Sequence, residues 1–330
     1  MTSAAQDAAS WLANPRATRE TLEAFGLATK HRLGQNFLVE DNIIRKIIRL
    51  AELTSDDVVL EVGPGLGTLT VAMLDYVRAV CSIEADRELE GVLATTCKEP
   101  HQDSFVLCMG DALKATPQLV GDAYASLEVF ADADGKGESG VLIGPNKFVS
   151  NLPYQVAATL ILLFFQEFTT LEQAIVMVQA EVADRIAAKP GTKAYGAYTA
   201  KLALYAQVSG RFEVAPGNFM PPPRVNSAVV RLERAPMTDP SGTSVLTSEQ
   251  LFWVARVIDA AFAQRRKTIR NSMGASGFKK DTLERALLAA HIEPTVRAEA
   301  LGVKDFVRLA MALAEGGAYG EETAFVHGRR

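Results

Sequence analysis

Short apolar runs alternate with amphipathic stretches over the first two-thirds of the chain. Runs rich in Val, Ile and Leu predict buried strands, and an apolar period near 3.6 predicts helices between them. The strands are expected at Val58–Val62, Ala79–Ile83, Ser104–Met109, Lys147–Ser150 and Gln173–Val178, with closing strands at Arg211–Val214 and Val225–Leu232. The main helices are expected at Thr68–Tyr76, Asp86–Lys98, Gln155–Phe168 and Ala197–Val208. Strands that alternate with helices in this way indicate parallel pairing in an open α/β sheet.

Two polar segments interrupt the alternation. The segment 121–145 is acidic and rich in glycine, which predicts an exposed insertion without catalytic content. A polar linker after Arg234 contains Pro236, Pro240 and Gly242, and three helical patterns follow it at Glu249–Ala263, Thr282–Ala290 and Asp305–Ala314. We therefore expect an N-terminal extension (1–30), a catalytic domain (31–234) and a small all-helical domain (235–330).

The composition is that of a globular protein, with 48% apolar and 22% charged residues. The apolar run that begins at Val156 is too short for the ~20 residues of a membrane-spanning helix. The first residues lack the basic cluster and apolar core of a secretory signal. We expect a cytoplasmic monomer with no membrane partner.

The three cysteines, Cys81, Cys97 and Cys108, form no C-x-x-C pair and have no histidine at zinc-ligand spacing. They are interpreted as reduced structural thiols, and no metal site is expected.

Glycines follow the first predicted strand, in the segment Glu61-Val62-Gly63-Pro64-Gly65-Leu66-Gly67. Glycine allows a ligand to approach the backbone closely, and the helix that follows offers free N–H groups. A dinucleotide and S-adenosylmethionine both suit such a loop. The dinucleotide pattern G-x-G-x-x-G is not met, because Thr68 occupies the third glycine position. Glu61 could attract the cationic end of S-adenosylmethionine.

Carboxylates end the next two strands. Glu84 lies where it can accept both hydrogens of a ribose diol. Asp111 lies where it can accept a hydrogen bond from an adenine amine, although the role of a helix cap fits this residue equally well.

The tetrapeptide Asn151-Leu152-Pro153-Tyr154 follows the fourth strand and carries the acceptor chemistry. The Asn151 side-chain oxygen and the Leu152 carbonyl can accept both N–H bonds of an adenine N6 amine, which is a poor nucleophile that must be oriented. Pro153 restricts the turn, and Tyr154 offers a face for stacking. An isolated Asn-x-Pro would be only a turn signal.

Two further features point to nucleic acid. Phe219 precedes three prolines and could stack on the other side of an extruded base, or be an ordinary core aromatic. The net charge is -5, yet the segment that contains Arg265, Arg266, Lys267 and Arg270 has no acid. It is interpreted as a phosphate-binding surface rather than a solvated helix face.

Six motifs occur in the order found in the ribosomal RNA small-subunit adenine dimethyltransferases, and the chain resembles this family from Leu33 to about Asn271. They are His31–Leu38, Glu61–Gly65, Ile83–Asp86, Gly110–Ala112, Asn151–Tyr154 and Phe219–Ser227. After the tetrapeptide the family usually continues with Asn-Ile-Ser, whereas this chain has Gln155-Val156-Ala157. The segment 121–145 is a second departure.

The resemblance implies a Rossmann-like S-adenosylmethionine-dependent methyltransferase that dimethylates two adjacent adenosines near the 3′ end of 16S rRNA, within a small-subunit assembly intermediate. It implies cofactor contacts from Asn36, Leu38, Gly63, Gly65, Glu84, Asp111 and Asn151. Tyr154 and Phe219 would enclose the target base.

Three other functions compete with this one. A macrolide-resistance methyltransferase acts on 23S rRNA, but such relatives tend to carry Ile at the position of Leu152. A non-catalytic ribosome-assembly or transcription factor would not need Glu84, Asp111 and Asn151. A small-molecule methyltransferase would not need the basic segment.

Overall fold

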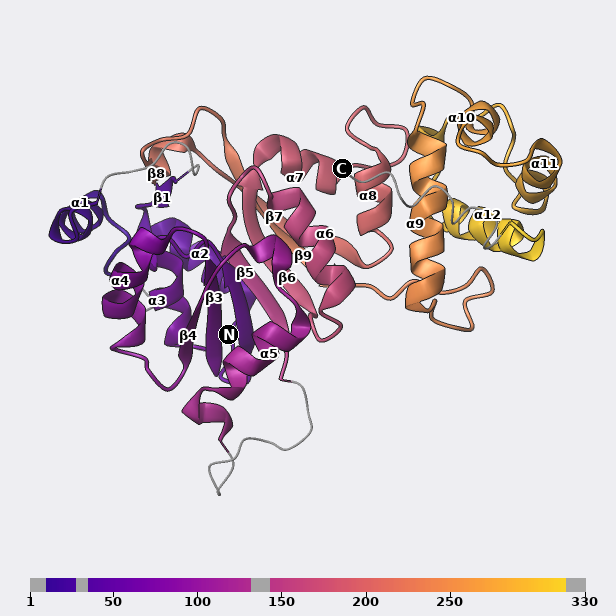
Figure 1. The fold of residues 1–330 in the computed structure, drawn as a ribbon. Coiled ribbons are helices and arrows are strands. Elements are labelled where there is room, and N and C mark those ends of the chain that lie inside the picture. The colour runs from indigo at the N-terminus through magenta and orange to yellow at the C-terminus, as the bar shows by residue number, and fades with distance from the viewer. Residues whose placement is uncertain (1–9, 28–34, 132–142, 319–330) are drawn as a thin grey trace. The chain divides into compact units, whose positions relative to one another are not determined.

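The chain forms two compact units in this computed structural model, which describes residues 10–27, 35–131 and 143–318 (Figure 1). The first, called the sheet unit below, combines Met1–Ala183 with Val208–Arg234. The second, the helical unit, combines Asp184–Gln207 with Ala235–Arg330. Residues 184–207 were expected in the catalytic domain, but they group with the C-terminal helices. The boundary at 234/235 coincides with the predicted linker.

A seven-stranded sheet forms the centre of the sheet unit, in the order β4-β3-β2-β5-β6-β9-β7. The five strands from β4 to β6 are parallel, and β9 pairs antiparallel with β6 from Gln179↔Ser227 to Gln173↔Glu233. A second, two-stranded sheet pairs Phe37 with Met220 and Leu38 with Phe219. The strands are β1 Phe37–Leu38, β2 Val58–Val62, β3 Ala79–Glu84, β4 Phe105–Met109, β5 Lys147–Asn151, β6 Gln173–Gln179, β7 Ala206–Val214, β8 Phe219–Met220 and β9 Ser227–Arg234. The α/β prediction is confirmed.

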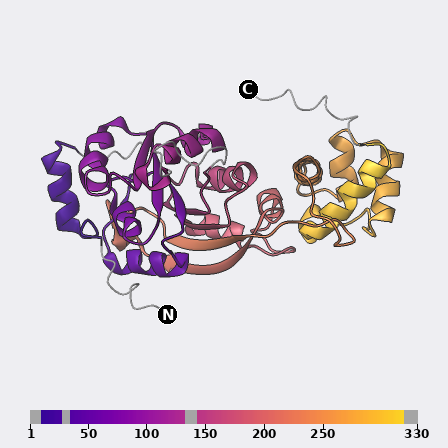
Figure 2. The same cartoon turned by 90° about the horizontal axis from the view of Figure 1, so that it is seen from below.

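Helices lie on both sides of the large sheet (Figures 1 and 2). Side chains alternate between the two faces of a strand, so both faces of these buried strands need cover. Thus Val149 joins the core formed with α2 and α3. The ring of Phe148 packs at a tilt against the ring of Phe164 of α6, with the ring centroids 4.9 Å apart. The helices of the sheet unit are α1 Pro15–Ala24, α2 Asp41–Ala51, α3 Thr68–Leu74, α4 Glu90–Leu93, α5 Pro117–Ala125 and α6 Ala157–Glu167, with α7 Ala180–Ile186 at its boundary. Single 3-10 turns (Arg87–Leu89, Ala112–Lys114, Glu128–Phe130, Pro216–Asn218) and a π-helical turn (Ala94–Lys98) complete it.

The predicted exposed insertion is wrong for residues 121–131. The helix α5 begins with Thr116 as its cap and continues to Ala125, and Tyr124 is fully buried. The Tyr124 hydroxyl donates a 2.7 Å hydrogen bond to the Val59 carbonyl, and its ring meets that of Phe130 edge-on. The acidic residues of 132–142 lie outside the described residues. The acidic and glycine-rich composition of the whole segment led to the wrong prediction for the apolar positions before residue 132.

Besides α5, two helices were absent from the predictions. The helix α1 begins at the Asn14 cap, and Leu12 and Leu22 reach the core of the sheet unit, so part of the predicted N-terminal extension belongs to that core. The helix α10 is short and begins at the Thr268 cap. In addition, the helix expected over Ala197–Val208 ends at Leu202, because the chain enters β7 at Ala206.

The helical unit has its own hydrophobic core. A capping box of Thr247 and Gln250 begins α9, and Trp253 of that helix donates a 2.8 Å hydrogen bond to the Ala310 carbonyl of α12. Its helices are α8 Ala197–Leu202, α9 Ser248–Phe262, α10 Ile269–Ala275, α11 Lys280–Ala289 and α12 Val303–Glu315, with a 3-10 turn at Ala298–Ala300.

Candidate active site

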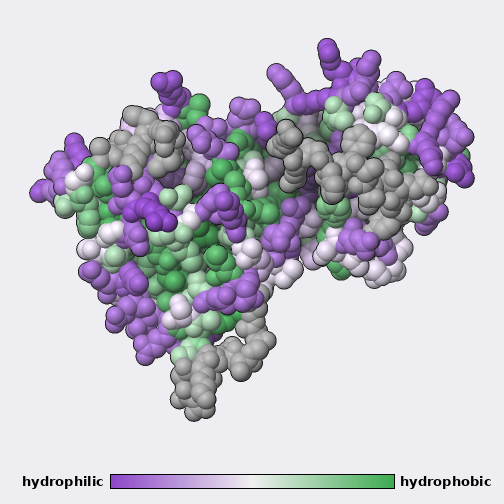
Figure 3. Space-filling model, viewed as in Figure 1, coloured by the Kyte–Doolittle hydropathy of each residue, from purple (hydrophilic) through white to green (hydrophobic). Residues whose placement is uncertain are grey.

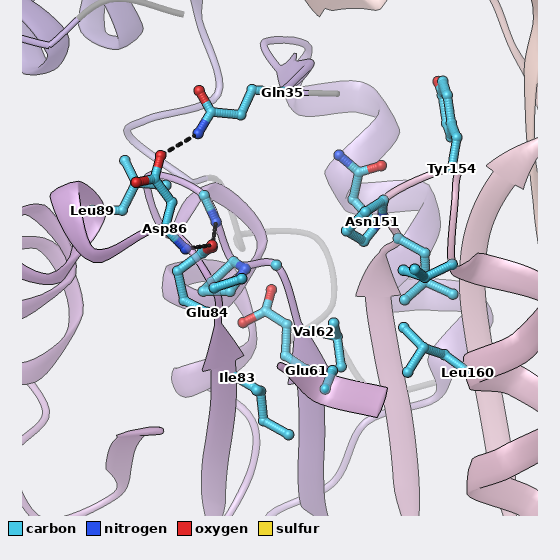
Figure 4. Close-up of a pocket in the computed structure, with 18 of the residues that line it drawn as sticks. Gln35, Glu61, Val62, Ile83, Glu84, Asp86, Leu89, Asn151, Tyr154 and Leu160 are labelled. Carbon is cyan, nitrogen blue, oxygen red and sulfur yellow. Dashed lines mark hydrogen bonds between the residues drawn. The ribbon is translucent and has the colours of Figure 1, made fainter. Parts of the chain in front are cut away.

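A cavity of about 290 Å³ opens at the carboxyl ends of β2, β3, β4 and β5 in the sheet unit. In open α/β sheets this edge is where ligands bind, because the loops that leave parallel strands converge there. The cavity brings together all the predicted cofactor residues and the whole tetrapeptide 151–154. Figure 4 shows Gln35, Glu84 and Asp86 along one wall and Asn151 and Tyr154 along the other.

The glycine loop approaches two other motifs closely. Gly63 and Gly65 have φ angles of 67° and 63°, in the left-handed region that favours glycine. A Cβ on Gly63 would lie 3.3 Å from the Pro153 ring, and one on Gly65 would lie 3.1 Å from the Phe37 ring. The absence of side chains at these two glycines therefore lets the loop pack closely against Pro153 and Phe37, which also line the cavity.

The Glu84 carboxylate is held at the cavity wall by backbone donors. Its oxygens accept hydrogen bonds from the Asp86 N–H at 2.8 Å and the Gly65 N–H at 3.4 Å. Burial raises the pKa of Glu84, and the N–H bonds oppose that shift. Gln35 donates to Asp86 at 2.8 Å, which ties the segment before β1 to the same wall.

Glu61 lines the cavity, so its attraction for a cationic ligand stays a prediction, and its carboxyl also has structural contacts. This carboxyl is buried below the loop, and one of its oxygens accepts hydrogen bonds from the hydroxyls of Thr70 and Ser82, both at 2.7 Å. Burial raises its pKa from the ordinary 4.5 to about 7, so the group is only partly charged near neutral pH. Its contacts are those of a group that holds α3 and β3 together beneath the loop.

Asp111 caps a helical turn and also lies where it could meet a ligand, while its contact with an adenine amine stays a prediction. Its side chain caps a 3-10 turn by accepting the Leu113 N–H at 3.0 Å. The residue also lines the cavity.

The tetrapeptide presents polar atoms to the cavity from the end of β5. Asn151 donates through Nδ2 to the Asn36 carbonyl at 3.3 Å, which leaves its side-chain oxygen as an acceptor. The Leu152 N–H donates to the Met177 carbonyl at the end of β6, so the turn is anchored to the sheet. Tyr154 is half-buried, and its hydroxyl shares a 2.7 Å hydrogen bond with the hydroxyl of Ser227.

Phe219 is not brought to this cavity. It is only 3% exposed and belongs to the core of the sheet unit, where β8 pairs with β1. The structure therefore shows the core aromatic that the sequence left open, and a stacking role for this ring stays a prediction.

The four basic residues of the helical unit fall into two groups. Arg265 donates to the Lys193 and Tyr195 carbonyls at 2.7 and 3.0 Å and pairs with Glu299 at 3.3 Å, so it holds the loop before α8. Arg266 is exposed, and Lys267 and Arg270 line a hollow of about 620 Å³ together with Lys280. Arg270 also lies 3.7 Å from a Glu284 carboxylate oxygen, which partly offsets its charge.

Several functional contacts were missed by sequence reasoning. Gln35 and Ser227 lay inside quoted motifs, but only the fold shows that they bond to Asp86 and Tyr154. Residues 31–34 of the first motif lie outside the described residues. Within the described ranges, no group of His, Cys, Asp and Glu could hold a metal ion, and the Cys81 and Cys108 sulfurs lie 3.7 Å apart as thiols. None of the helices described is long and apolar enough to span a bilayer.

Residues 26–315 match the family Ribosomal RNA adenine dimethylase. The chain is 38% identical over 307 residues to Ribosomal RNA small subunit methyltransferase A of Kineococcus radiotolerans, covering 92% of this chain and 93% of the relative. It is 38% identical over 302 residues to the protein of the same name from Streptomyces coelicolor, covering 91% and 96%.

Two solved structures share the fold at lower identity. A dimethyladenosine transferase from Plasmodium falciparum superposes with a TM-score of 0.66 at 23% identity, covering 84% of this chain and 96% of that one. The 23S rRNA methyltransferase ErmE superposes with a TM-score of 0.59 at 23% identity, covering 84% and 100%. At this identity the two structures show a shared fold, and a fold alone does not select a substrate.

Proposed function

The chain belongs to the ribosomal RNA adenine dimethylase family, and we propose that it dimethylates N6 of two adjacent adenosines near the 3′ end of 16S rRNA. It is a methyltransferase that uses S-adenosylmethionine. The observation that carries the proposal is the oriented Asn151 amide, which lies in the same cavity as the Glu84 carboxylate. The relatives named for the small ribosomal subunit support 16S over 23S rRNA as the substrate.

The cavity fits the cofactor by the hydrogen-bond acceptors and glycines that line it. Glu84 presents a carboxylate for a ribose diol, Asp111 can accept from an adenine amine, and Gly63 and Gly65 line the cavity without side chains. S-adenosylmethionine supplies an electrophilic methyl group when it is bound there.

The residues of the tetrapeptide perform the acceptor half of the reaction. The Asn151 side-chain oxygen and the Leu152 carbonyl accept the two N–H bonds of the adenine amine, which favours the pyramidal nitrogen of the transition state. Tyr154 holds the base by stacking. No side-chain base is required, because the proton on nitrogen becomes acidic as the new N–C bond forms and can pass to water.

The helical unit supplies a surface for RNA phosphates in this proposal. Lys267, Arg270 and Lys280 converge on one hollow, and Figure 3 shows a hydrophilic surface over α11, which begins at Lys280. Arg266 lies beside them on the exposed turn before α10. Arg265 contributes by holding the adjacent loop in place. The partner we propose is a small-subunit assembly intermediate, met by a monomer in the cytoplasm.

Mass spectrometry of both rRNAs from cells that lack this gene tests the proposal. We expect the loss of two dimethyladenosines from 16S rRNA and an unchanged 23S rRNA. A loss confined to 23S rRNA would instead establish the large-subunit activity. Unchanged rRNAs, together with no binding of S-adenosylmethionine to the purified protein, would indicate a non-catalytic assembly factor.

A further inference from the structure

The hydroxyl of Ser227 is buried against the half-buried ring of Tyr154 at the rim of the cavity. Ser227 has no exposed surface, and its oxygen lies 2.7 Å from the Tyr154 hydroxyl oxygen. Ser227 begins β9, opposite Gln179 at the end of β6. An antiparallel strand therefore places its first residue at the edge of the sheet where the parallel strands end, beside the tetrapeptide.

The position of Ser227 is rigidly determined. Its strand pairs with β6 along seven consecutive residue pairs, and the preceding Asn226 carbonyl accepts the Ala180 N–H at 2.9 Å. Tyr154, in contrast, lies in the turn between β5 and α6, outside both elements. A tyrosine in a turn has two side-chain torsions that can change, and a hydrogen bond at the tip of the ring restricts both.

We propose that Ser227 is a positioning residue that holds the Tyr154 ring in the orientation that stacks on the target adenine. This inference rests on the proposed function of Tyr154. Ser227 itself does not line the cavity, so its effect passes through the tyrosine. The bond also satisfies a serine hydroxyl that would otherwise be buried without a partner.

The test is a double-mutant cycle of Ser227→Ala and Tyr154→Phe in the full chain, assayed on undermethylated small ribosomal subunits with saturating S-adenosylmethionine. Each single change should lower kcat about ten-fold, as expected when roughly one orienting hydrogen bond is lost. The KM for the subunits and the Kd for S-adenosylmethionine should stay within about two-fold, since neither change removes a cofactor contact. The double variant should be no slower than either single one, because both changes break the same bond.

Thr18→Ala is the matched control. Thr18 is also fully buried, and its hydroxyl bonds to the Leu12 carbonyl at 3.3 Å in the N-terminal segment, away from the cavity lining. This control should leave kcat unchanged even if it lowers the melting temperature. Should Ser227→Ala fail to fold, Tyr154→Phe and Ser227→Thr, which keeps the hydroxyl, still test the bond.

Additive losses in the double variant, or wild-type kcat in Ser227→Ala, would overturn the inference. These results are distinct from a failure of the proposed function, in which the wild-type protein itself would not methylate the small subunits.

Discussion

In the proposed function, Asn151 is the residue on which the acceptor chemistry depends. Its amide is oriented by the Asn36 carbonyl, so the side-chain oxygen is preorganised for an incoming amine and no reorganisation is needed during the reaction. We expect Asn151→Ala to lower the methylation rate about 100-fold or more, as the loss of a transition-state acceptor does. The circular dichroism spectrum and the melting temperature should remain close to wild type, because Asn151 ends its strand at the cavity. A wild-type rate in this variant would exclude the assigned role.

Glu61 makes the stability of the sheet unit depend on pH. Its folded pKa of about 7 lies above the ordinary 4.5, so the folded state binds the proton more tightly than the unfolded state does. The resulting stabilisation is fully present below pH 4.5 and is lost as the pH rises through about 7, with a total of about 3 kcal/mol.

Urea denaturation between pH 5 and 8 measures this effect. Glu61→Gln cannot titrate and keeps an oxygen that accepts the hydroxyls of Thr70 and Ser82, so it should lack this part of the pH dependence. Parallel curves of unfolding free energy against pH for the two proteins would show that Glu61 titrates at its ordinary pKa.

For single residues, the sequence predicted which side chains reach the site better than it predicted their hydrogen-bond partners. Gly63, Glu84, Asp111 and the tetrapeptide 151–154 all reach one cavity, because each lies at the carboxyl end of a parallel strand and those ends share an edge. The contacts of Arg265 were not predictable, since Lys193, Tyr195 and Glu299 are distant in sequence. Phe219 shows the same limit, because a buried aromatic and a stacking aromatic have the same sequence pattern.

The element that differs most from its prediction is α5. An acidic, glycine-rich composition dominated the segment, yet one aromatic ring, Tyr124, anchors it to β2 through the Val59 carbonyl. By contrast, the five parallel strands were predicted within one residue at each end, because a short continuous apolar run between helical segments is typical of a parallel strand covered on both faces. The prediction for β7 was wrong at its start, since the strand begins at Ala206 and not at Arg211.

Replacement of Tyr124 by Phe tests the corrected position of α5. Loss of the hydroxyl leaves the buried Val59 carbonyl without this donor, so the free energy of unfolding should fall by about 1–3 kcal/mol. Leu119→Ala on the same helix is the control, since Leu119 is 48% exposed and should cost little. Equal effects of the two substitutions would contradict a buried, anchored α5.

For the whole molecule, the proposed function assigns the chemistry to one compact unit and the affinity for RNA to the other. The cavity and its polar residues belong to the sheet unit, whereas Arg266, Lys267, Arg270 and Lys280 belong to the helical unit. The overall charge of -5 does not argue against RNA binding by this basic surface, because affinity for RNA depends on local fields rather than on the net charge.

Salt dependence distinguishes a phosphate-binding surface from a solvated one. Arg266→Gln with Lys267→Gln should weaken rRNA binding and reduce the slope of log K against log salt by about one to two. Arg19→Gln with Arg49→Gln removes the same charge from exposed positions of the sheet unit and should leave the slope unchanged.

Arg265→Ala should lower the stability of the helical unit more than it changes the slope, because its bonds are internal. Identical slopes for wild type and the first pair would show that these side chains do not contact phosphate.

The hydrogen bond between Tyr154 and Ser227 joins positions that are 73 residues apart. During translation it therefore cannot form until Ser227 has been synthesised. A nascent chain that has emerged only as far as α6 already contains Gly63, Glu84, Asp111 and Asn151. It does not yet contain the strand that begins at Ser227. In the proposed site, the wall for the methyl donor is thus synthesised before the residue that positions the Tyr154 ring, and the acceptor side is completed last.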